Sequence, residues 1–121
     1  NPVFRPEMNG QKVPHDLYMS HLYVHGDALQ GQKRCVSLNA ATVTIRDSYI
    51  ADCKGVGNDT QAIGGWNGPG PYLIENNYLE GAGENVLFGG SDPAIANLVT
   101  DGIVGCALTQ WTAPTSCSAA A

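Results

Sequence analysis

A repeat of short apolar runs constrains the fold of this chain more than any other feature. Three eight-residue segments align without gaps, namely 17–24, 43–50 and 72–79. The alignment places Met19, Ile45 and Ile74 at one shared position, separated by 26 and then 29 residues. Repeats of this length, separated by turns rich in Gly, Asn and Asp, predict units that stack to bury a common core.

The spacing inside each unit predicts strands. Apolar residues alternate along the segments, as at Val43 and Ile45, which fits the two-residue period of a strand and argues against a helical repeat. Fifteen glycines and seven prolines in 121 residues also disfavour long helices. A polar residue takes the next inward position of each unit, where we expect an inward-pointing bend. These bend residues are His21, Asp47 and Asn76.

A second set of strands is expected between the first, at residues 35–39, 61–65 and 86–90. The chain should form a single domain, with 1–14 as a lead-in or cap, 15–95 as the repeated region and 96–121 as a cap or tail. No run approaches the roughly 20 apolar residues that span a bilayer, so we expect no membrane anchor.

Three phrases carry a resemblance to a known family: VTIRDSYIADC, QAIGGWNGPGPYLIENNYLEGAGENVLFGG and SDPAI. They resemble uncharacterised bacterial right-handed parallel β-helix repeat proteins of pectate-lyase-like architecture, over roughly residues 15–95. The resemblance implies an all-β, right-handed parallel β-helix solenoid of about three to four rungs. It also implies carbohydrate as the ligand class, and we expect export to an extracellular or periplasmic location.

Charge is distributed unevenly along the chain. All six Lys and Arg residues precede position 55, whereas residues 55–121 hold six Asp and Glu residues and no basic one. The second half therefore lacks the cationic surface that nucleic-acid binding requires. The same field would repel a polyanionic polymer unless divalent cations bridged the two.

The cysteines and histidines leave alternatives open. The four cysteines show no zinc-type spacing and suit either two disulfides in an exported protein or buried thiols; they are Cys35, Cys53, Cys106 and Cys117. A zinc or copper triad would need His15, His21 and His25 to converge. We favour structural roles for them, with His21 at the bend and His25 facing outward, and predict no metal site.

An aromatic surface is the predicted carbohydrate contact. Trp66 lies in the rigid loop 64–71, where an indole at a groove edge would stack on a sugar ring, and Asn67 follows it. Tyr49 and Tyr78 would extend this surface as a stack that also includes Tyr23. The simpler interpretation is that Trp66 covers the edge of the core while the tyrosines stabilise the sheet.

Loop carboxylates are the candidate catalytic groups. A glycoside hydrolase needs two carboxylates about 5–9.5 Å apart. The candidates are Asp52, Asp59, Glu80 and Glu84, for which simple turn chemistry is the alternative. The resemblance also implies a lyase hypothesis, in which calcium and a basic residue act together. The residues for that hypothesis are Arg46, Asp47, Asp52 and Glu75, with an Arg46–Glu75 pair expected between neighbouring strands.

Two functions follow from the sequence. The first is a carbohydrate-associated module that binds or processes polysaccharide, as a hydrolase or lyase. We expect no cofactor, with calcium as the alternative. The second is a non-catalytic structural domain that self-associates into a homo-oligomer through exposed ends of the repeat. The sequence alone does not decide whether the protein is an enzyme.

Overall fold

The computed structural model describes residues 13–95, 98–100, 102–108 and 119–120, and the described part is all-β with no helix. The strands are β1 His15–Ser20, β2 Tyr23–His25, β3 Arg34–Ser37, β4 Ala41–Arg46, β5 Tyr49–Cys53, β6 Gln61–Gly65, β7 Tyr72–Gly81, β8 Glu84–Phe88, β9 Gly102–Leu108 and β10 Ala119–Ala120. The interpretation of residues 1–12 and 109–118 lies outside the described residues, as do the side chains of Cys106 and Cys117.

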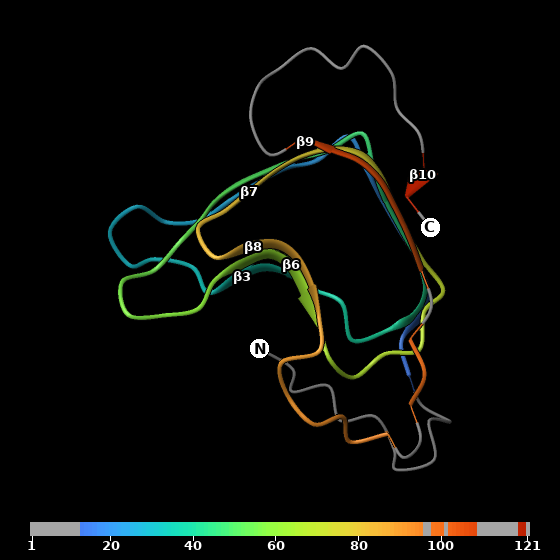
Figure 1. Cartoon of the computed structure of the whole chain (residues 1–121). Helices are drawn as coiled ribbons and strands as arrows, with labels where there is room; N and C mark the ends of the chain where they lie inside the picture. Colours follow the sequence, from blue (N-terminus) through green and yellow to red (C-terminus); the bar gives the residue numbers. More distant parts are fainter. Residues whose placement is uncertain (1–12, 96–97, 101, 109–118, 121) are drawn as a thin grey trace.

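The strands form two sheets, drawn in Figure 1. The larger has the order β1-β4-β7-β5-β2, and β9 adds to β7. It curls as a half-barrel around the smaller sheet, whose order is β3-β6-β8. Every strand pair is parallel except β10 with β9, which is antiparallel. The prediction of an all-β fold with parallel strands is confirmed.

The assignment to pectate-lyase-like right-handed β-helix proteins is wrong. The described strands do not form a regular stack of rungs, because the long strand β7 pairs with both β4 and β5 and joins them into one curled sheet. The pairing of β5 with β7 also shifts register between Ile50 and Cys53. A repeat in the sequence predicted parallel neighbours, but it did not define how the strands are divided between sheets.

The predicted apolar columns of the larger sheet are present. Met19 pairs with Ile45, and Ile45 pairs with Ile74. A second column joins Val24, Ile50 and Leu79. Neighbouring parallel strands lie about 4.8 Å apart, so matched apolar side chains pack directly against each other.

The predicted register of the smaller sheet is wrong by one or two residues. Val36 pairs with Ile63, and Ile63 pairs with Val86. The sequence alignment had matched the glycine pairs at 64–65 and 89–90, but Gly64 instead pairs with Leu87. Burial of Ile63, which has no exposed surface, determines the register.

At the bends of Asp47 and Asn76, the inward position is one residue later than predicted. His21, Asp47 and Asn76 have φ values of 55°, 51° and 52°, a left-handed conformation that Asn, Asp and His tolerate better than most residues. His21 and Asn76 are exposed and Asp47 is half-buried, whereas the next residues, Ser48 and Asn77, are buried. The bend residues are therefore selected for their backbone conformation.

Buried polar side chains link the successive bends by hydrogen bonds. The amide of Leu22 donates to Ser48 Oγ at 3.1 Å, and the amide of Ser48 donates to Asn77 Oδ1 at 3.0 Å. Asn77 Nδ2 donates in turn to the carbonyl of Ile45 at 2.9 Å. These bonds satisfy backbone groups that the bend removes from the strand ladders.

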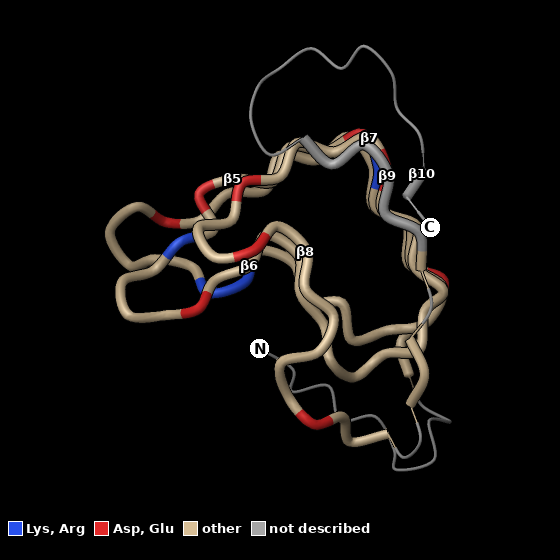
Figure 2. The backbone as a smooth tube through the Cα atoms, in the orientation of Figure 1, with Lys and Arg blue, Asp and Glu red and all other residues tan. Residues whose placement is uncertain are grey.

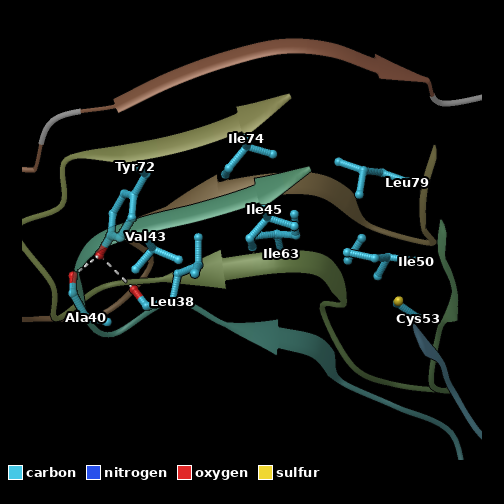
Figure 3. Packing of buried hydrophobic residues seen from close by; sticks show 11 residues of the cluster. Leu38, Ala40, Val43, Ile45, Ile50, Cys53, Ile63, Tyr72, Ile74 and Leu79 are labelled. Carbon is cyan, nitrogen blue, oxygen red and sulfur yellow. Dashed lines mark hydrogen bonds between the residues drawn. The ribbon is translucent and has the colours of Figure 1, made fainter. Parts of the chain in front are cut away.

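The core lies between the two sheets (Figure 3). Ile45, Ile63 and Ile74 are at most 1% exposed. The hydroxyl of Tyr72 lies within hydrogen-bond distance of the carbonyls of Leu38 and Ala40, and burial raises the pKa of this phenol. The full cluster comprises Leu38, Ala40, Val43, Ile45, Ile50, Cys53, Ala62, Ile63, Tyr72, Ile74 and Leu79.

A disulfide connects the sheets. Cys35 of β3 and Cys53 of β5 are bonded with an S–S distance of 2.02 Å. Of the alternatives left open by the sequence, a disulfide is therefore present for this pair. In the described part of the chain, no helix is long and apolar enough to cross a membrane.

Removing this disulfide should lower the free energy of unfolding by about 3 kcal/mol, because the bond closes a loop with a sequence separation of 18 residues. The variant is Cys35→Ser with Cys53→Ser, compared with the parent by urea unfolding. Equal unfolding midpoints for the two proteins would show that the bond does not constrain the unfolded chain.

Candidate functional site

A row of three tyrosines lies on the outer face of the larger sheet. Tyr23, Tyr49 and Tyr78 are register partners on β2, β5 and β7. The rings of Tyr49 and Tyr78 stack with centroids 4.3 Å apart and planes 5° apart, and those of Tyr23 and Tyr49 lie 5.4 Å apart. The predicted tyrosine stack is therefore present. We call these three residues the tyrosine row.

The rings of the row are not equally available. Tyr49 and Tyr78 cover each other's facing surfaces, and Tyr49 is 42% exposed. Tyr23 is 66% exposed and is inclined by 59° to Tyr49, with the ring of His25 5.0 Å from its own. An incoming apolar ring would therefore stack on Tyr23, at the end of the row.

Polar groups border the row. The hydroxyl of Tyr78 donates to Glu80 Oε2 at 3.2 Å. Partial burial, and then this bond to a carboxylate, raise the pKa of Tyr78, so the phenol remains a donor at neutral pH. Lys54 Nζ donates to Asp52 Oδ1 at 3.0 Å, a bond that raises the pKa of Lys54, and Glu80 adds to the effect.

The four candidate catalytic carboxylates lie in two places. Asp52 and Glu80 are on β5 and β7 of the larger sheet and both act on Lys54. Glu84 begins β8 of the smaller sheet, where it accepts a hydrogen bond from Gln61 Nε2 at 2.9 Å, and Asp59 lies just before β6. Asp52 and Glu80 are thus the candidates that accompany the tyrosine row.

Trp66 and Asn67 lie elsewhere, directly after β6. The amides of both residues donate to Asn39 Oδ1, at 3.0 and 3.1 Å, which fixes the loop. The guanidinium carbon of Arg34 lies 4.7 Å from the centroid of the Trp66 ring and covers one of its faces. Asn67 is buried, and its Oδ1 accepts hydrogen bonds from the amides of Ala94 and Ile95.

The three histidines have separate partners. His15 contacts Asp16, His21 contacts Ser20, and His25 bonds to the carbonyl of Gly26 at 3.0 Å. Within residues 13–95, 98–100 and 102, where side chains are described, no three His, Cys, Asp or Glu residues are grouped to hold a metal ion.

Three of the four residues of the lyase hypothesis form an ion-pair cluster, whereas the fourth, Asp52, pairs with Lys54 instead. Arg46 Nε lies 2.8 Å from Asp47 Oδ2, and Arg46 Nη1 lies 3.3 Å from Glu75 Oε1, so the expected Arg46–Glu75 pair is confirmed. Hydrogen bonds from Asn76 and Arg46 lower the pKa of Asp47, and the bond to Asp47 raises that of Arg46. A guanidinium held protonated in this way is poorly suited to act as a base.

Sequence reasoning missed a groove between two loops. It has a volume of about 560 Å³ and lies between residues 28–33 and 54–58. Lys54 lines this groove as well as bonding to Asp52, and Lys33 lines it from the other loop. The charged residues within these loops are the basic Lys33 and Lys54, and acidic residues flank the loops at Asp27 and Asp59 (Figure 2). The pairing of Gln32 with Lys54 through the backbone, at 2.7 Å, aligns the two loops.

No family model matches this chain, and no match was found among curated proteins or solved structures.

Proposed function

We propose that the protein is a carbohydrate-binding module whose contact surface is the tyrosine row. The observation that supports this proposal is the exposed ring of Tyr23 at the end of a stacked series, with the imidazole of His25 beside it and the carboxylate of Glu80 beside Tyr78. The apolar face of a sugar ring would stack on Tyr23, and its hydroxyl groups would bond to His25, while Glu80 lies at the other end of the row beside Tyr78. Stacking of this kind contributes about 0.5–1.5 kcal/mol beyond burial.

The chemistry beside the row favours a neutral polysaccharide. Lys54 is paired with Asp52, and Glu80 is close by, so carboxylates compensate the ammonium group on this surface. A processing activity would act through Asp52 and Glu80, which lie beside the row. We further propose an extracellular or periplasmic location, which the Cys35–Cys53 disulfide supports because such bonds persist in oxidising compartments.

Tyr23→Ala should weaken retention on a neutral polysaccharide by roughly tenfold in affinity gel electrophoresis, because it removes the most exposed ring of the row. Tyr18→Ala is the matched control, since Tyr18 is also 66% exposed but lies on β1 outside the row. Equal losses in both variants, or none in either, would contradict the assignment of binding to the row.

A second candidate function is structural self-association. Four large apolar side chains, namely Leu17, Tyr18, Leu22 and Tyr23, are exposed on β1, β2 and the bend between them. β1 and β2 end the path of the larger sheet, and β3 is an edge of the smaller one. If two copies associated at this end, their open strand edges would pair and these exposed apolar side chains would be buried.

Leu22→Lys should shift a concentration-dependent oligomer to monomer in size-exclusion chromatography with light scattering, because it places a charge in the proposed interface. Leu29→Lys, at a 97% exposed loop position, is the control and should leave the oligomer unchanged. A parent protein that stays monomeric at millimolar concentration would rule out this second function.

A further inference from the structure

The open edge of β8 provides a position for one additional strand. The larger sheet contains the series β1-β4-β7-β9, whereas the smaller sheet contains only β3-β6-β8. β1, β4 and β7 each have a following counterpart in the smaller sheet, namely β3, β6 and β8. Among the described residues, no strand follows β9 into the smaller sheet, and none pairs with β8 on the side away from β6.

The side chains of β8 indicate what this position would accept. Val86 is half-buried over Ile63, which has no exposed surface, so an apolar neighbour would complete this column. Phe88, 37% exposed, stacks on Tyr72 with ring centroids 5.1 Å apart. Apolar residues opposite Val86 and Phe88 would therefore cover the open end of the core.

The charge of Glu84 indicates which residue an added strand should place opposite it. Arg34, Gln61 and Glu84 form one register column, and Glu84 is exposed. Gln61 bonds to Glu84 Oε2, which leaves Oε1 as an acceptor for an incoming cation. A strand beside β8 should thus carry a basic residue opposite Glu84, followed by apolar residues two and four positions later.

We propose that β8 binds an extended peptide segment of another protein by strand addition, with this basic-x-apolar-x-apolar pattern. Strand addition supplies main-chain hydrogen bonds, while alternate side chains supply specificity. The strand β3 and the residue after it show the pattern on the other side of β6, as Arg34, Val36 and Leu38.

Two other occupants fit the geometry less well. If a second copy placed its β3 beside β8, its β1 would need the position beside β7, where β9 already pairs. Residues 55–121 hold no Lys or Arg, so the part of this chain after β8 does not offer the basic residue opposite Glu84. A single strand from a separate chain satisfies both constraints.

The test uses the full chain and a labelled peptide of residues 33–39 carrying Cys35→Ser, followed by fluorescence anisotropy. The peptide should bind, and its Arg34→Glu form should bind at least about tenfold more weakly. The protein variant Glu84→Lys should reverse this preference. Asp16→Lys, the same change of charge on β1, is the control and should keep the parent's preference.

Hydrogen exchange gives a second readout that does not depend on the variants. In the free protein, β8 amides that face away from β6 should exchange rapidly, and the peptide should slow them. Absence of peptide binding would overturn the proposal. If the β8 amides were protected in a free monomer, the chain itself would occupy the position beside β8. If the protein formed an oligomer that Glu84→Lys dissociates, a second copy would occupy it. Either result would overturn the proposal.

Should Glu84→Lys fail to fold, as judged by circular dichroism, the two peptides on the parent protein decide the question. The outcome is separable from carbohydrate binding, because Tyr23 lies on the larger sheet and β8 on the smaller.

Discussion

Parallel pairing of matched apolar residues is the interaction on which the remaining structure depends. Ile45 is buried because Met19 lies on one side of it and Ile74 on the other, in register. The same arrangement buries Ile50 in the larger sheet and Ile63 in the smaller. Each strand is too short to bury its own apolar face, so the core forms only when successive strands align. Outer-face residues then align as a consequence, and the tyrosine row is one result.

The strands could be predicted because their periodicity is local and strong. Alternation in Val43–Ile45 and the repeat of Met19, Ile45 and Ile74 predicted both the elements and their register in the larger sheet. The alignment of the smaller sheet failed because glycine pairs are a poor marker of register: Gly64 and Gly65 are in a strand, whereas Gly89 and Gly90 follow one and have positive φ values. The division of strands between sheets depends on pairings of β7 that no local pattern encodes.

The bends show a similar limit. The polar residue at a fixed position predicts an inward side chain at each bend, yet His21, Asp47 and Asn76 have left-handed backbone conformations, and Ser48 and Asn77 are the buried residues. Asn76 Nδ2 still donates to Asp47 Oδ1 at 2.7 Å, so these two bend residues do bond to each other between neighbouring strands. Polar residues such as Asn, Asp and Ser suit both the left-handed position and the buried position of a bend. The residue types alone therefore could not show which of the two neighbouring residues points inward. Among the site residues, the tyrosine stack followed from the repeat. By contrast, the covering of Trp66 by Arg34 and the link from Lys54 to the loop groove depend on tertiary contacts.

Register between β4 and β7 is the most direct test of this account, and engineered cysteines can measure it. Thr44 and Leu73 are partners on these strands, so Thr44→Cys with Leu73→Cys should form a disulfide under mild oxidation, identified by peptide mass spectrometry. Thr44→Cys with Glu75→Cys is displaced by two residues and should remain largely unbridged. Equal bridging in the two proteins, or preferential bridging of the displaced pair, would contradict in-register packing as the basis of the fold.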